Sequence, residues 1–145
     1  MKCETLLAVK KLSRRINREV SRLKRMEDII LKTNAELDGL PHSNNHASIV
    51  EKVAVAAVDL KQKITELIEV RATCRIELTQ WLERLIGNFY VECQTLIYRY
   101  AFEFEFCSIA RRLGYSVSSV YRFHASGLSM LGLSASEIHH LELES

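Results

Sequence analysis

The sequence is poor in the residues that interrupt helices. Its 145 residues include only 5 glycines and 1 proline, whereas β-sandwiches and barrels need turn-forming residues about every 8 to 12 positions. No apolar run approaches the roughly 18 residues of a membrane span, and the N-terminus lacks the apolar core of a signal peptide. We therefore expect an all-α protein of the cytoplasm, without a membrane segment.

Patterns that support catalysis or metal binding are also missing. The sequence has no Gly-rich phosphate loop and no paired carboxylates in a credible pocket. The cysteines lie far apart, outside any CxxC spacing, at Cys3, Cys74, Cys93 and Cys107. We expect them to be reduced, small apolar side chains. An enzyme, a cofactor and a metal site are therefore not expected.

Net charge is small, at +2, which by itself does not indicate a nucleic-acid partner. Its distribution is uneven, because the first 45 residues carry ten Lys or Arg against six Asp or Glu. The basic surplus is therefore concentrated near the N-terminus.

Two long amphipathic segments are predicted within residues 1–86. Residues 4–37 carry apolar side chains three, four or seven positions apart, which indicates a helix. From Val50 to Leu85 the spacing alternates three and four, as in a coiled-coil seam, and Arg71 interrupts the seam. Turn-forming residues and the proline lie between them, which predicts a loop over residues 38–47. A long antiparallel helical hairpin is expected, and a dimer joined seam to seam is the alternative.

One side of the first segment is basic. Its cations recur at intervals of four, three, four and three, and they are Lys11, Arg15, Arg18, Arg22 and Arg25. They are candidate phosphate contacts. A solvated face that keeps the helix soluble, or a site for the acidic surface of a partner, explains the same spacing.

Residues 106–131, FCSIARRLGYSVSSVYRFHASGLSML, carry the most specific pattern. Counted from residue 106, a small residue is fifth, a glycine is ninth, and apolar anchors are fifteenth and eighteenth; these are Ala110, Gly114, Val120 and Phe123. Gly114 can take the positive φ of a turn, and Ser116 is a suitable N-cap. The spacing predicts a helix-turn-helix, within a domain of residues 87–131.

The second helix of this motif would present an outer face to a DNA major groove. The candidate DNA-binding residues are Arg111, Arg112, Ser116, Val117, Ser118, Ser119, Tyr121, Arg122 and Ala125. No acidic residue occurs in the stretch, which favours DNA, although three arginines predict only modest phosphate attraction. An ordinary hairpin whose second helix simply packs is the alternative.

His124 lies at the edge of the packed face, where we expect a partly buried ring bonded to backbone or to a DNA phosphate.

The segments that flank the motif are also predicted to be helical. Residues 89–100 indicate a buried helix. The alternation of Phe102, Phe104 and Phe106 with glutamates resembles a strand, but no partner strand is available, so a tight connection is expected. Ser134 and Glu137 form a capping box for a short helix in the C-terminal segment 132–145, which is expected to be either that helix or a frayed tail.

Residues 113–131 resemble the last helix pair of bacterial sigma-factor region four. The order of parts resembles the phage-encoded RinA/ArpU-like late transcription regulators more closely. In that family a helical hairpin precedes an "RY" helix end, matched by Arg99 and Tyr100, and a helix start matched by residues 105–110. An "LGYS...VYRLH..AL..L" block follows, matched within residues 113–131.

This chain departs from the family at two kinds of position. Gly127 stands for Ala inside the recognition helix, at a cost of about 1 kcal/mol in helix stability. Val117, Ser118 and Ser119 stand where sigma-like relatives often carry long polar side chains. Direct base reading is therefore expected to be thin.

The resemblance implies a sequence-specific DNA-binding regulator of phage or prophage genes that acts with host RNA polymerase. A homo-oligomer is expected, because two tethered half-sites would raise the affinity of a module with few base-reading side chains. The alternative is a helical interaction protein that binds a host protein such as RNA polymerase through its coiled arm, without reading DNA.

Overall fold

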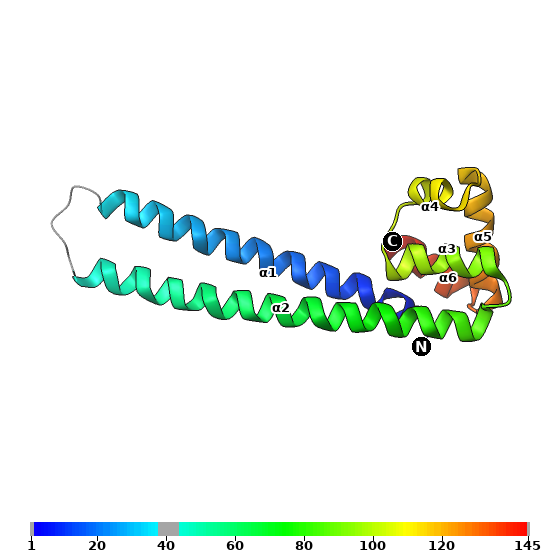
Figure 1. Cartoon of the computed structure of the whole chain (residues 1–145), viewed down its shortest axis with the longest axis horizontal. Coiled ribbons are helices and arrows are strands. Elements are labelled where there is room, and N and C mark those ends of the chain that lie inside the picture. Colours follow the sequence, from blue (N-terminus) through cyan, green and yellow to red (C-terminus); the bar gives the residue numbers. More distant parts are fainter. Residues whose placement is uncertain (1, 38–43, 145) are drawn as a thin grey trace. The chain divides into compact units, whose positions relative to one another are not determined.

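A computed structural model describes the backbone of residues 2–37 and 44–144, and the side chains of residues 2–36 and 48–144. The described elements, in chain order, are α1 (Lys2–Leu37), α2 (Asn44–Ile86), α3 (Tyr90–Leu96), the π-helical turn η1 (Ile97–Ala101), α4 (Phe106–Leu113), α5 (Val117–Met130) and α6 (Ala135–Glu144) (Figure 1). In this part of the chain every regular element is a helix, so the predicted all-α class is confirmed.

The predicted loop is shorter than expected. Residues 44–47, which were assigned to a loop over 38–47, belong to α2. The rest of that prediction, residues 38–43, lies outside the described residues.

The chain forms two compact units, one of residues 12–70 and one of residues 1–11 with 71–145. We expected a boundary after residue 86, between an arm and a helix-turn-helix domain. The boundary differs because the start of α1 and the C-terminal part of α2 share a core with the later helices. Leu6 of α1 and Leu82 of α2 belong to the same buried cluster as Leu96 of α3 and Leu128 of α5.

In the unit of residues 12–70, α1 and α2 pair as an antiparallel hairpin. Their buried seam consists of Ile16, Ala57, Leu60, Ile64 and Leu67. Two ion pairs of 3.7 Å join the helices in antiparallel order, Glu19 to Lys63 and Glu27 to Lys61. The predicted hairpin is thus confirmed. Its seam is filled by side chains of the same chain.

The seam changes register in the second unit. Leu85, predicted as a seam residue, is 51% exposed, whereas Leu82 and Ile86 are buried. From Leu78 onward the buried positions are therefore four apart. In this unit α2 packs against several helices at once. Its buried side chains therefore follow a single row with a spacing of four residues, and not the alternating three-and-four spacing of a two-helix seam.

The C-terminal segment is a helix, one of the two forms expected. The backbone N–H of Ser134 donates to Glu137 Oε2 at 2.8 Å, and the N–H of Glu137 donates to Ser134 Oγ at 3.3 Å. These bonds are the predicted capping box, and the bond that the Ser134 N–H donates to the carboxylate lowers the pKa of Glu137. Leu141 is fully buried in the shared core, so α6 packs as part of this unit.

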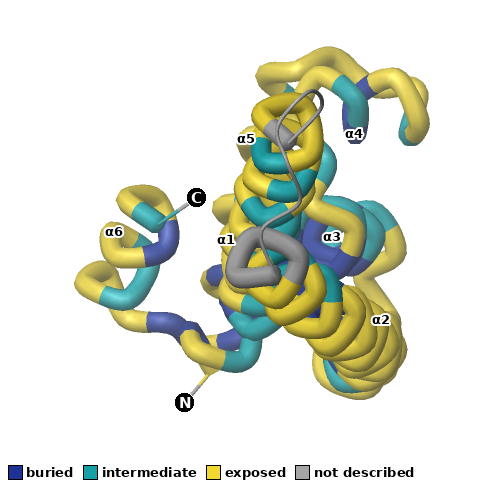
Figure 2. Tube along the Cα trace, turned by 90° about the vertical axis from the view of Figure 1, so that its left-hand side faces the viewer, coloured by how far each residue is buried: buried dark blue, intermediate teal, exposed yellow. Residues whose placement is uncertain are grey.

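Helix α5 crosses α3 at very short range. Gly127 is buried, and a β-carbon built there would lie 3.0 Å from Leu96 Cδ1 and 3.1 Å from Leu96 Cγ. Leu96 is itself fully buried, and Figure 2 shows α3 with a buried, dark blue stretch. Gly127 lowers the intrinsic stability of α5, but it permits the close contact with Leu96 of α3.

We predict that Gly127→Ala lowers the free energy of unfolding by about 1 kcal/mol. The gain in helix propensity is about 1 kcal/mol, but overpacking against the fully buried Leu96 typically costs about 1 to 3 kcal/mol. Denaturant unfolding should show a lower midpoint with an unchanged slope. Ser126→Ala, at the exposed neighbouring position, is the control and should be neutral or slightly stabilising. A more stable Gly127→Ala protein would show that the approach of α3 and α5 is not limiting.

Candidate nucleic-acid interface

The turn between α4 and α5 has the predicted geometry. Gly114 adopts φ +76°, and its N–H donates to the carbonyl of Ala110 at 2.9 Å. Ser116 is extended, and its Oγ accepts from the N–H of Ser119 at 3.2 Å, which caps the first turn of α5. The glycine and cap predictions are therefore confirmed.

A small core holds α4 against α5. Ile109 and Val120 are fully buried, and Ala110 is 5% exposed, so its small side chain lets the helices approach. Phe123, predicted as the second anchor of α5, is only half-buried, and its ring lies T-shaped to that of Tyr115 with centroids 5.0 Å apart. Phe104 and Phe106, from the connection and the start of α4, pack against this core in its place.

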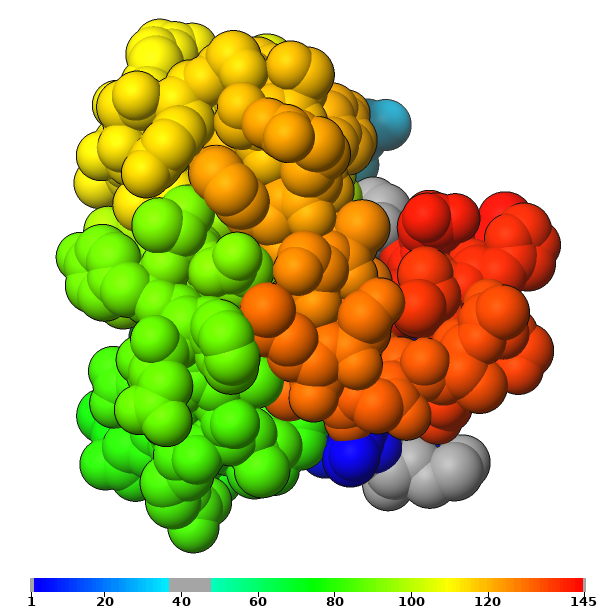
Figure 3. Space-filling model, turned by 90° about the vertical axis from the view of Figure 1, so that its right-hand side faces the viewer, coloured from blue at the N-terminus to red at the C-terminus, as the bar shows by residue number. Residues whose placement is uncertain are grey.

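The outer face of α5 is exposed as predicted. Its residues are Val117, Ser118, Tyr121, Arg122 and Ala125. In the space-filling view, α4 in yellow and the first turns of α5 in orange form one continuous surface (Figure 3).

The serines at the start of α5 do not all face outward. Ser116 Oγ lies 3.2 Å from Ser118 Oγ and 2.9 Å from Ser119 Oγ. Arg122 Nη2 donates to Ser119 Oγ at 3.1 Å. Ser116 and Ser119 are thus engaged in capping and in orienting Arg122, and the polar groups on the outer face are those of Ser118, Tyr121 and Arg122.

Arg111 and Arg112 are both exposed at the end of α4. The guanidinium of Arg112 lies 4.4 Å from the centroid of the Phe104 ring and 6.0 Å from that of Tyr98. Such stacking restrains the side chain while leaving its charge at the surface.

Two further arginines contact this region, and no pattern in the sequence indicated their partners. Arg75 of α2 donates from Nε to the carbonyl of Ala101 at 2.9 Å and forms a 3.4 Å ion pair with Glu103. Arg99 of η1 lies 4.4 Å from the Phe106 ring centroid and donates to the carbonyl of Phe104 at 3.2 Å. Both satisfy carbonyls where the chain leaves η1, so they fix the connection that enters α4.

The structure gives His124 an internal partner in place of the expected phosphate or backbone group. Its Nε2 lies 2.8 Å from the hydroxyl of Tyr100, and its ring packs edge-on against Phe106. Burial, together with the smaller effect of the nearby Arg99 charge, lowers the pKa of His124 to about 4. Burial also raises the pKa of Tyr100. Both groups are therefore uncharged at neutral pH, so the His124 ring brings no positive charge to a phosphate.

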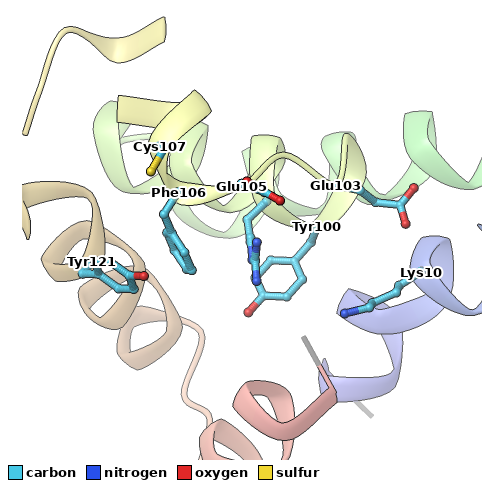
Figure 4. Close-up of a pocket in the computed structure, with 8 residues that line it drawn as sticks. Lys10, Tyr100, Glu103, Glu105, Phe106, Cys107 and Tyr121 are labelled. Carbon is cyan, nitrogen blue, oxygen red and sulfur yellow. The ribbon is translucent and has the colours of Figure 1, made fainter. Parts of the chain in front are cut away.

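A pocket of about 480 Å³ opens beside the start of α4 (Figure 4). Its wall includes Lys10 and Arg99 as cations, Glu103 and Glu105 as anions, and the rings of Tyr100, Phe106 and Tyr121, with Cys107 at the edge. The opposite charges leave it without a net preference for an ion of one sign.

The predicted basic stripe is exposed. Arg15, Arg18, Arg22 and Arg25 lie at the surface of the unit of residues 12–70, and Lys11 lies at the surface of the other unit. Arg22 forms one ion pair, at 3.8 Å to Glu19. Exposure of this kind suits both a solvated face and phosphate contacts.

Comparison of the chain with protein-family models, curated proteins and solved structures found no match. Within residues 2–37 and 44–144, no helix is both long enough and apolar enough to cross a membrane.

We predict that acid destabilises the protein through His124. The unfolded chain takes up a proton below the ordinary pKa of 6.5, whereas the folded ring does so only near 4. The contribution of neutral His124 to the free energy of unfolding is therefore fully present above pH 6.5 and is lost as the pH drops toward 4. The free energy of unfolding should fall by about 2 kcal/mol between pH 7 and pH 5.

Denaturant unfolding at a series of pH values measures this loss. His124→Phe, whose ring does not titrate, should lose less stability over the same interval. His140→Gln, on the exposed side of α6, should keep the wild-type dependence. An equal loss in all three proteins would place the acid-sensitive group elsewhere.

Proposed function

We propose that this chain is a double-stranded DNA-binding protein that places α5 in the major groove. The observation that carries the proposal is the combination of a left-handed Gly114 turn with a capped α5 whose outer face is exposed. A major groove about 12 Å wide admits one α-helix, and recognition helices contact bases through their N-terminal residues.

Charge supports the same partner. Residues 106–131 contain no Asp or Glu, and Arg111, Arg112 and Arg122 are exposed. In this proposal Arg122 reaches a base edge, while Arg111 and Arg112 contact phosphates on the flank of the groove. Arg or Lys paired with guanine O6 and N7 is the commonest specific contact of this kind.

The wider role rests on the resemblance to RinA/ArpU-like regulators. On this basis we propose that the protein is a cytoplasmic transcriptional regulator of phage or prophage genes that works with host RNA polymerase. If the protein also forms a homo-oligomer, the contact lies on a surface other than the hairpin seam, because that seam is filled within the chain.

A second candidate function is an interaction protein that binds a host protein through the hairpin. Exposed apolar side chains of residues 12–70 favour it, since Leu31, Val55 and Val58 are 68%, 57% and 64% exposed. The two functions differ in their response to DNA and salt. A regulator prefers one duplex sequence over competitor DNA and loses affinity as salt rises, whereas an interaction protein shows no sequence preference.

We predict that Arg122→Ala weakens binding to a selected target duplex by about 1 to 3 kcal/mol, the value of one good base contact. Fluorescence anisotropy with the selected duplex and a scrambled duplex measures it. Arg122 is exposed, so the thermal melt should change little. Arg84→Ala, an exposed arginine of α2, should bind as the wild type does. A loss of equal size on both duplexes would assign Arg122 to the phosphates.

The basic stripe gives a separate prediction. If Arg15, Arg18 and Arg22 each contact a phosphate, replacing all three by Gln should weaken binding to every sequence. The slope of log K against log salt should then become shallower by about 3, since each neutralised phosphate contributes about 0.9. A triple Gln variant of Lys24, Lys32 and Lys52, exposed lysines outside the stripe, serves as the control. An unchanged slope in the arginine variant would identify the stripe as a solvated face.

A further inference from the structure

The outer face of α5 is divided into two rows of different chemistry. One row, four residues apart, is Val117, Tyr121 and Ala125, and the neighbouring row contains Ser118 and Arg122. Residues at this spacing lie on one side of a helix, one turn after another. We call the first set the apolar row.

The apolar row is open to solvent. Val117 is 37% exposed and Tyr121 is 53% exposed, and Ala125 is exposed as well. The valine and alanine side chains have neither donor nor acceptor atoms, so they make no hydrogen bond to a base edge. If this face enters a major groove, these side chains have to meet an apolar group there.

Tyr121 is held in place before any partner binds. Its ring stacks on that of Phe106, with centroids 4.3 Å apart and an angle of 28° (Figure 4). Phe106 is in turn covered by the guanidinium of Arg99 and the ring edge of His124. A contact made by Tyr121 would therefore cost little side-chain entropy.

The surroundings of the row fit DNA. Arg122 lies beside it, and Arg111 and Arg112 are exposed on the preceding helix, in a stretch without acidic residues. In the major groove the exposed apolar group is the C5-methyl of thymine, which valine, alanine and aromatic side chains can contact.

We propose that the apolar row recognises thymine methyl groups, so that the target site carries thymines facing Val117, Tyr121 and Ala125, beside the base pair contacted by Arg122. This inference rests on the proposed DNA-binding function and adds the class of sequence to it. Discrimination comes from shape and methyl burial, with Arg122 supplying the polar contact.

The test begins with selection of duplexes from a random library by the full-length protein. Each thymine of the selected site is then replaced by deoxyuridine, which removes the methyl group and keeps base pairing and the O4 acceptor. Burial of one methyl is worth about 0.8 kcal/mol, or about a fourfold change in affinity. We expect about this loss at two or more thymines inside the site. Deoxyuridine substitutions at thymines outside the selected site are the control for a change in DNA flexibility, and they should not change the affinity.

A double-mutant cycle links one thymine to one residue. Val117→Ala should weaken binding to the thymine site and remove the effect of deoxyuridine at one position only. Val58→Ala, an equally conservative change at a 64% exposed position of α2, should retain the full deoxyuridine effect at each thymine.

The outcomes separate this inference from the proposed function. If a sequence is selected and every deoxyuridine substitution within it is neutral, thymine recognition is wrong while DNA binding stands. If no sequence is enriched over competitor DNA, both are wrong, and the row becomes a candidate surface for a protein partner.

Discussion

The close crossing of α5 and α3 at Gly127 is the contact on which the arrangement of the second unit depends. A helix with one exposed face is held in place by the packing of its opposite face. On α5 this packing includes Gly127, which has no side chain and so allows close contact with α3. The backbone of α5 approaches Leu96 so closely that a β-carbon would lie at 3.0 Å. Leu128, next in the chain, is fully buried in the same core. The C-terminal half of α5 is thereby fixed, and its N-terminal half projects over α4.

The N-terminal half of α5 is positioned by a layer of rings and guanidinium groups. Phe106 is the centre of this layer, because Arg99, Tyr121 and His124 all pack against its ring. Tyr100 completes it through the hydrogen bond to His124. The layer connects η1, α4 and α5 through contacts whose geometry is specific. Val120 and Ile109, both fully buried, add an apolar contact between α4 and α5.

The same layer explains why few polar side chains remain for an external partner. The pocket beside α4 combines two cations with two anions, and the serines that begin α5 bond to one another and to Arg122. The chain uses much of its polar chemistry internally. On the outer face of α5 it leaves exposed Arg122, Ser118 and the row of Val117, Tyr121 and Ala125, and a partner has to match that combination.

Local patterns in the sequence were sufficient for the helices, the turn and the caps. The roles of Gly114, Ser116, Ser134 and Glu137 follow from backbone geometry and hydrogen bonds within a few residues, so spacing alone predicts them. The hairpin seam followed from a repeat that a two-helix contact imposes. The outward face of α5 followed from the same periodicity.

Contacts between distant parts of the chain were decided by the tertiary structure. The shift of the buried row to Leu82 and Ile86, the internal partner of His124 and the bond from Arg75 to Ala101 each join segments that the sequence separates. The sequence marked Gly127 as a cost to its helix, whereas the structure shows the neighbour that requires it. Periodicity identifies which side of a helix is buried, but which side chains meet there depends on the packing of several helices at once, and that packing has no local signature.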